Sequence, residues 1–403
     1  MANKRDLFTV GVLIVILTIV GCKTNIGPNN PSFVTSQLTP LVTSILAEPR
    51  PAMLSNGTIQ TNYEIICINA LSHQVTLENL KVIDPATPAG PIISLSQKEL
   101  LTLIRIPGSA QATTTFGPGQ MGYIRINLLF EDVSEIPSEF NHIITLSNAS
   151  PSPSMDKTIT QHISQAAVNF EPVPVISPPL KGNNWVADAV GLYSPHRLTT
   201  MPIDGALKTP ERWAVDWIKL TSDNKLSTGD PKENKSYPQY GEEIIAVADG
   251  VILNTVNNLP DGQPGKMPAN ITIDTAGGNY VYQDIGNGYS AFYAHLIPGT
   301  LKFKKGDFVK KGEVLGLLGN SGNSDAPHLH FQVNKGQSPL GSDGVPYLID
   351  SFIQIGYLDS KDYLETELKA IPHQSLEIKP LLEKMSRCSN KMPFNIAVVN
   401  FSD

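Results

Sequence analysis

Two histidines, His328 and His330, stand two positions apart in the sequence. On a β-strand they would share one face, because side chains alternate across the pleat, so one imidazole could bind a metal while the other transfers a proton. The segment 319–327, rich in Gly, Asn and Ser, precedes them and would let the backbone approach a substrate closely. A third histidine, His295, and a carboxylate within an apolar segment, Asp216, complete the candidate constellation.

From about Arg212 to Val333 the chain resembles the lysostaphin/LytM-type zinc endopeptidases, which cut peptide cross-bridges in bacterial cell walls. Besides the HxH pair, the motifs that carry the resemblance are, in chain order, AVADGVI at 246–252, GNYV at 278–281, GNGY at 286–289, YAHL at 293–296 and GDFVKKGEVLG at 306–316. The resemblance implies a C-terminal antiparallel β domain of the LytM-like type, with a duplicated hybrid or barrel-sandwich architecture.

The resemblance also implies a zinc site. In this family the metal is bound by the His and Asp of an HxxxD motif and by the second His of HxH, which gives Asp216 and His330 here. The other two family histidines fall on His295 and His328 and would be catalytic, stabilising an oxyanion or transferring a proton. At the usual position of the first histidine, four residues before Asp216, stands Arg212. Arginine is not a ligand, because it is permanently protonated and has donors only.

Three interpretations of Arg212 remain open from the sequence. His196, in a loop that precedes Asp216, could supply the missing third ligand. Alternatively, the guanidinium of Arg212 could pair with Asp216 in the metal's place, and the groove would then bind peptidoglycan without cutting it. In the third interpretation Arg212 points away from the site.

The composition narrows the class of protein. A length of 403 residues suggests two or three domains, and the formal charge of −7 argues against a nucleic-acid partner. With 17% charged residues, 31 glycines and 32 prolines, the chain has the profile of a loop-rich, mainly β protein.

The N-terminus predicts export. A basic start and an apolar run from Leu7 to Val20 precede Gly21 and Cys22, as in a lipoprotein signal peptide, and the run is too short to span a membrane. Cys22 would be the lipidation site, with residues 1–21 as the signal peptide and 22–38 as a flexible tether. The expected location is the cell envelope, in the outer membrane or facing the periplasm if the organism has two membranes. The alternative is a plain secretory signal.

The rest of the mature chain divides into segments by composition. Residues 39–170 show short alternating strands between turn residues, which predicts an immunoglobulin-like β-sandwich. Residues 171–180 form a Pro-rich linker, 181–358 the LytM-like peptidase domain, and 359–403 a C-terminal extension with a helix and a last strand. Cys67 and Cys388 either form a disulfide or remain buried thiols.

The sequence therefore predicts a cell-envelope lipoprotein whose zinc metalloendopeptidase domain hydrolyses peptide cross-links of peptidoglycan. Its expected partners are peptidoglycan peptides and the membrane, through the N-terminal lipid, with no nucleic acid. The alternative is a catalytically degenerate LytM-like protein that binds peptidoglycan or regulates a partner wall hydrolase such as an amidase. A third interpretation makes the sandwich the functional part, as an adhesion or assembly module.

Overall fold

The computed structural model describes residues 38–87, 90–107, 109, 111–191, 194–363, 373–381 and 386–402. From Thr39 onward the chain forms one compact unit, and it is mainly β, as predicted. The predicted signal peptide, Cys22 and nearly all of the tether lie outside the described residues. No helix in the described part is long and apolar enough to cross a membrane.

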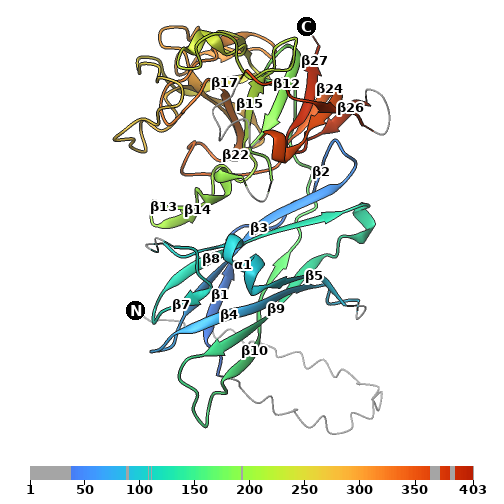
Figure 1. The fold of residues 1–403 in the computed structure, drawn as a ribbon, viewed down its shortest axis with the longest axis vertical. Coiled ribbons are helices and arrows are strands. Elements are labelled where there is room, and N and C mark those ends of the chain that lie inside the picture. The colour runs from blue at the N-terminus through green and yellow to red at the C-terminus, as the bar shows by residue number, and fades with distance from the viewer. Residues whose placement is uncertain are drawn as a thin grey trace, which may run out of the picture. The chain divides into compact units, whose positions relative to one another are not determined.

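The N-terminal half consists of two antiparallel sheets, whose strands form separate layers in Figure 1. The first contains β1 (Leu41–Ile45), β2 (Ala52–Met53), β3 (Ile59–Asn69), β6 (Ile104–Arg105) and β8 (Met121–Phe130). The second contains β4 (Val75–Ile83), β5 (Pro91–Ser96), β7 (Thr115–Phe116), β9 (Glu139–Asn148) and β10 (Thr158–Ala167). Helix α1 (Gln97–Leu103) and the 3-10 turn η1 (Val133–Glu135) connect strands.

The alternation in the sequence explains these sheets. Along β9, buried and partly exposed residues alternate without interruption, so every second side chain enters one shared core between the two sheets. The segments predicted as strands lie within β3, β4, β8 and β9. We call this half the sandwich; its immunoglobulin-like classification stays a prediction.

The C-terminal half is built on one large sheet of 13 strands, ordered β11-β24-β27-β12-β15-β22-β19-β18-β17-β20, with β23, β25 and β26 attached. Its strands are β11 (Val175–Ile176), β12 (Gly182–Asp188), β15 (Val215–Lys219), β17 (Gly250–Val256), β18 (Asn279–Gly286), β19 (Tyr289–Leu296), β20 (Phe308–Val309), β22 (Leu329–Lys335), β23 (Asp343–Gly344), β24 (Leu348–Leu358), β25 (Ile378–Lys379), β26 (Ser386–Lys391) and β27 (Ala397–Phe401). Two short two-stranded sheets accompany it: the hairpin of β13 (Met201–Ile203) and β14 (Ala206–Lys208), and the pair of β16 (Glu243–Ile245) and β21 (Val314–Leu317).

The last strands of the chain are integral to this sheet. β27 pairs with both β12 and β24, so residues of the predicted C-terminal extension complete the sheet that carries the candidate site. The helix predicted in the extension falls largely on residues 364–372, which lie outside the described residues. Even the predicted linker takes part, because β11 pairs in parallel with β24.

The two halves share packed side chains. Ala52 and Leu54, from the sandwich side, are buried in the same hydrophobic core as the large sheet. The backbone of Ser55 donates a hydrogen bond of 2.8 Å to the carbonyl of Met392. The predicted alternative of a disulfide is not realised: Cys67 and Cys388 are both free and buried, one in β3 and one in β26.

Candidate active site

Three adjacent strands, β15, β22 and β19, carry most of the candidate residues. The register places Asp216 on β15 directly opposite His330 on β22, and places Ala294 of β19 opposite His330 on its other side. His295 follows Ala294 on β19 and therefore lies close to His330. The sheet thus brings together residues that are up to 114 positions apart in sequence.

A direct contact in the site joins His330 to Asp216. The Nδ1 atom of His330 lies 2.9 Å from Oδ1 of Asp216. On the opposite edge of the ring, Nε2 lies 2.8 Å from Oε1 of Gln332, which is fully buried. An amide oxygen only accepts, so Nε2 of His330 must carry the proton and donate it to Gln332.

The orientation of the Gln332 amide is set by its own partners. Its nitrogen donates to Oδ1 of Asn334 at 2.8 Å and to the carbonyl of Pro339 at 3.0 Å. The nitrogen of Asn334 in turn donates to the carbonyls of Pro210 and Ser342. This buried relay gives Nε2 of His330 a fixed acceptor, so Nδ1, which faces Asp216, is the ring nitrogen that a metal could bind once it displaces the proton shared with that carboxylate.

His196 reaches the same carboxylate from outside the sheet. It lies in the 3-10 helix η2 (Pro195–Leu198), which Ser194 caps by accepting a hydrogen bond from the His196 backbone. Nε2 of His196 is 3.1 Å from Oδ2 of Asp216, and its ring meets that of His330 edge-on with centroids 4.8 Å apart. Its Nδ1 is buried and has no hydrogen-bond partner among the described residues.

The charges at Asp216 reinforce one another. Burial alone would raise the pKa of Asp216, but the charges of His196 and His328 and the hydrogen bonds from His196 and His330 hold that pKa well below its usual range. For His196, burial opposes protonation, yet the charge of Asp216 outweighs it and raises the pKa of His196 to about 9. Without a metal, protons therefore occupy positions where a cation would bind.

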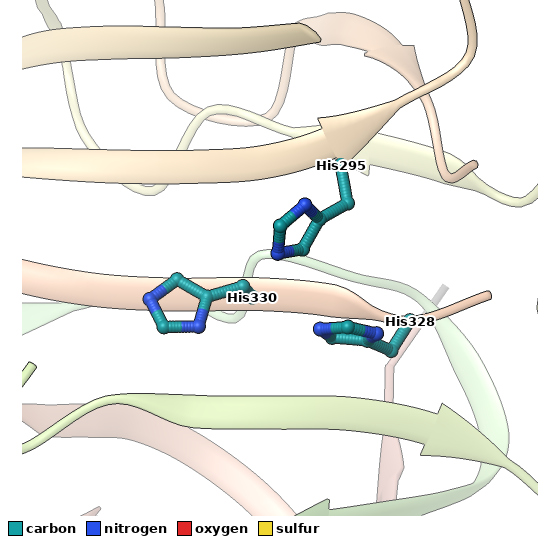
Figure 2. Close-up of side chains that lie close together, drawn as sticks. All are labelled: His295, His328 and His330. Carbon is teal, nitrogen blue, oxygen red and sulfur yellow. The ribbon is translucent and has the colours of Figure 1, made fainter. Parts of the chain in front are cut away.

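The two remaining histidines face this cluster, as Figure 2 shows: the ring of His295 extends from β19 toward His328 and His330. The ring centroids of His295 and His328 are 4.7 Å apart. Nδ1 of His295 donates to the carbonyl of Ser321 at 2.7 Å, and Nδ1 of His328 donates to that of Ala326 at 2.9 Å. Each ring therefore keeps Nε2 for chemistry.

His295 also shows backbone strain. Its φ is 68°, in the left-handed region that non-glycine residues seldom adopt and that is common at functional sites. Burial and then the charges of His328 and His330 hold the pKa of His295 well below its ordinary value. The ring is therefore neutral near pH 7, with a free lone pair on Nε2.

Arg212 occupies neither the ligand position nor the metal's place. Its Nε donates to Glu64 of β3 at 2.8 Å, Nη1 donates to the carbonyl of Gly344 at 3.0 Å, and Nη2 lies 3.4 Å from Asp343. The expectation that it pairs with Asp216 is wrong, because a buried carboxylate of the sandwich binds it instead. The interpretation in which Arg212 points away describes the structure, and His196 stands where the first family histidine was expected.

Three buried or partly buried polar residues around the site were missed from the sequence: Gln332, Asn334 and Asp188. Gln332 and Asn334 follow His330 at alternate positions on β22, so the strand periodicity already places them on its face. Asp188 lies opposite Asp216 on β12 and accepts a hydrogen bond of 2.8 Å from the hydroxyl of Tyr363. A rule that polar side chains rarely sit buried without a partner would have selected Gln332 and Asn334.

The donor set fits a zinc ion. One ligand atom each from His196, Asp216 and His330 lies within 4.8 Å of the others, and so does one each from His295, His328 and His330. Two imidazole nitrogens and one carboxylate are a usual set for a catalytic zinc that keeps one position open. The first group opens on a cavity of about 370 Å³, which His295 and His328 also line.

Comparison with known proteins identifies part of the chain. Residues 236–342 match the model of Peptidase family M23. Endolysin 2638A of Staphylococcus phage 2638A is 32% identical over 137 residues, 30% of this chain and 28% of that protein. Lysostaphin from Staphylococcus simulans is 39% identical over 118 residues, 27% of this chain and 24% of that protein. Peptidoglycan DD-endopeptidase ShyA of Vibrio cholerae is 32% identical over 93 residues, 23% of this chain and 17% of that protein.

This chain therefore spans about a quarter of the length of the curated relatives that it matches. Among solved structures, the catalytic domain of lysostaphin from Staphylococcus simulans shares 19% identity, with a TM-score of 0.22, over 40% of this chain and 88% of that chain. A TM-score this low supports no statement about the fold. His196 and Asp216 both precede the matched residues 236–342, so the match covers only His295, His328 and His330 of the cluster.

Proposed function

On the premise that this chain carries a LytM-type domain of peptidase family M23, we propose that it is a zinc-dependent endopeptidase that hydrolyses peptide bonds in peptidoglycan. The observation that carries the proposal is the convergence of His196, Asp216 and His330 beside a cavity that two further histidines line. The name of the Vibrio cholerae relative gives peptidoglycan as the substrate, which supports the same substrate class here.

In this proposal His196 through Nε2, Asp216 through its carboxylate and His330 through Nδ1 hold the metal. Zinc bound there would supply Lewis acidity and lower the pKa of a water molecule to about 7. Gln332 leaves Nδ1 of His330 for the metal, because its amide oxygen accepts a hydrogen bond from the opposite ring nitrogen. The carboxylate balances the positive charge that the two imidazoles alone would leave uncompensated.

His295 and His328 would act on the substrate. The neutral His295 ring has its Nδ1 proton bound to Ser321, so Nε2 is free to accept a proton from attacking water. His328 lines the same cavity and has its Nε2 3.6 Å from Oδ1 of Asp216. In this proposal its ring would stabilise the oxyanion that develops on the peptide carbonyl.

The alternative, a degenerate LytM-like protein that binds peptidoglycan or regulates a wall amidase, was motivated by Arg212 in the metal's place. The contacts of Arg212 with Glu64, Asp343 and Gly344 remove that motive. The alternative then requires that the three converging ligands bind no zinc.

We also propose that the protein is exported and anchored in the cell envelope through a lipid on Cys22, with peptidoglycan as its main partner. The basic start, the short apolar run and the Gly21-Cys22 pair support this location. Metabolic labelling with a radioactive or alkyne-tagged fatty acid tests it: Cys22→Ser is expected to abolish the label.

The function is tested by zinc content and hydrolysis together, in the chain that begins at Lys23. About one zinc per chain is expected for the parent protein, with loss of zinc and of cross-link hydrolysis in His196→Ala. His295→Ala is the matched variant: it is expected to keep zinc and lose hydrolysis, because His295 lies outside the proposed ligand set. A parent protein that remains metal-free after incubation with excess zinc would overturn the proposal in favour of the regulatory alternative.

A further inference from the structure

A single buried carboxylate on the sandwich binds two arginines of the C-terminal half. Glu64, at the middle of β3, is fully buried. Nη2 of Arg197 donates to its Oε1 at 2.9 Å, while Nε and Nη2 of Arg212 lie 2.8 Å and 2.7 Å from its Oε2. All three side chains are nearly inaccessible to solvent. Both oxygens of Glu64 therefore bind the other half of the molecule.

The two arginines lie close in sequence to two of the proposed ligands, His196 and Asp216. Arg197 directly follows His196 in η2, and Arg212 lies on the turn that leads into β15 and Asp216. Between these positions runs the β13–β14 hairpin, which pairs only with itself in the described sheets. Glu64 therefore ties together the two ends of the segment that must bring His196 to Asp216.

Besides these contacts, η2 is held by the Ser194 cap, by the contact of His196 with Asp216 and by a hydrogen bond of 3.4 Å from the Tyr123 hydroxyl to the Leu198 carbonyl. It spans four residues, and 3-10 helices of that length have poor internal hydrogen bonding. Arg197 is fully buried, and its Nε and Nη1 atoms have no hydrogen-bond partner among the described residues. Its Nη2 also reaches the carbonyls of Tyr63 and Ile126 of the sandwich, at 3.3 Å and 3.4 Å. Among the described residues, every hydrogen bond of its guanidinium is therefore made with the sandwich.

A buried arginine with few partners is unfavourable unless a charge compensates it. Glu64 supplies the charge for Arg197, and without it the guanidinium would gain by turning toward solvent. Because Arg197 and His196 are neighbours in one short helix, that movement would carry the His196 ring away from Asp216. The position of the third ligand thus depends on a residue of the sandwich.

We propose that Glu64 is a positioning residue for the metal site, which holds His196 against Asp216 by binding Arg197 and Arg212 together. The inference rests on the proposed function, since it assigns the N-terminal sandwich a role in binding the zinc ion. It predicts that the sandwich controls zinc affinity although none of its residues belongs to the ligand set.

The test compares the zinc affinity of each variant with that of the parent, both in the chain that begins at Lys23. Affinity is measured by competition with a chromophoric chelator, far below the unfolding temperature. Glu64→Gln keeps the size of the side chain and removes its charge, and zinc affinity is expected to fall at least about tenfold. Tyr63→Phe is the matched control on the same strand: it removes the hydrogen bond to His142 at 2.8 Å and leaves the arginines untouched. It is expected to lower thermal stability without changing zinc affinity.

A second variant guards against failure to fold. In Arg197→Met, Glu64 keeps its pairing with Arg212, so no buried charge is left uncompensated, yet the anchor of η2 is gone. Its zinc affinity is also expected to fall at least about tenfold. The absorption spectrum of cobalt(II), bound in place of zinc, should change in Glu64→Gln and Arg197→Met, because each loses His196 as a ligand. The spectrum of Tyr63→Phe should match that of the parent.

The outcomes separate the two proposals. If the parent chain binds no zinc, the proposed function fails and the role of Glu64 falls with it. If the parent binds zinc and both Glu64→Gln and Arg197→Met bind it equally tightly, only the positioning role is overturned. Loss of stability without loss of affinity in those variants would assign the cluster to domain packing alone.

Discussion

Replacing Gln332 should weaken zinc binding, although Gln332 faces the far edge of a ligand. In Gln332→Leu, Nε2 of His330 loses its acceptor among the described residues, the amide oxygen at 2.8 Å. The ring is then stabilised only with a proton on Nδ1, which donates a hydrogen bond to Oδ1 of Asp216 at 2.9 Å. Zinc must displace that proton before His330 can act as a ligand.

The expected magnitude follows from comparable outer-shell contacts. Losing such a partner costs about 10–100-fold in metal affinity, or about 1.4–2.7 kcal/mol. The same substitution removes two donated hydrogen bonds, to Asn334 and to Pro339. A buried acceptor left without a donor costs about 1–3 kcal/mol, so the free energy of unfolding should fall as well.

Gln332→Glu separates these two effects. Glutamate keeps an acceptor for His330 but donates nothing to Asn334 or Pro339, so it should lose stability like the leucine variant and keep the parental zinc affinity. Chelator competition gives the affinity, and thermal unfolding of the metal-free protein gives the stability. Parental zinc affinity in Gln332→Leu, at reduced stability, would refute the proposed control of the His330 tautomer.

Three further outcomes are expected. Zinc affinity should rise about tenfold per pH unit from pH 6 to about 9 and then level off. The pKa of His196 is raised to about 9 in the metal-free fold, and zinc must displace that proton. A zinc affinity that does not change between pH 6 and 8, measured by the same chelator competition, would contradict this. Arg212→His should lower the free energy of unfolding by about 3–5 kcal/mol, since it breaks a buried ion pair, and it should not increase zinc content. A gain of zinc, measured by elemental analysis, would contradict the contacts described for Arg212. Gly278→Ala should lower the free energy of unfolding by about 1–3 kcal/mol, because the φ of Gly278 is +60° and the added Cβ would lie 2.3 Å from the carbonyl oxygen of Ser321. That carbonyl orients His295, so hydrolysis should fall more than zinc content. Equal losses in the two assays would contradict the role of this carbonyl.

The sequence predicted the parts of the site that depend on local spacing. His330 and the apolar segment around Asp216 lie on adjacent strands, and His328 directly precedes β22, since strand periodicity and a known motif order fix such positions. The strands of the sandwich were likewise predictable from alternation. Each of these signals operates within a few residues.

His196 and Glu64 show where spacing stops being informative. His196 precedes Asp216 by 20 residues with a hairpin between them, so a motif of fixed length selected Arg212 instead. The partner of Arg212 is a carboxylate 148 positions away on another sheet. No local pattern encodes the packing of two sheets, and the direction of a buried side chain depends on that packing.

The position of β27 has a consequence for the order of folding. This strand comes after every other described strand in the chain, yet it lies between β24 and β12, and β12 pairs directly with the strand of Asp216. During synthesis, the N-terminal parts of a chain fold before its later parts arrive. The sheet then stays divided between β24 and β12 until residues 397–401 have been made. A chain truncated before this strand would carry every histidine of the candidate site on an unfinished sheet.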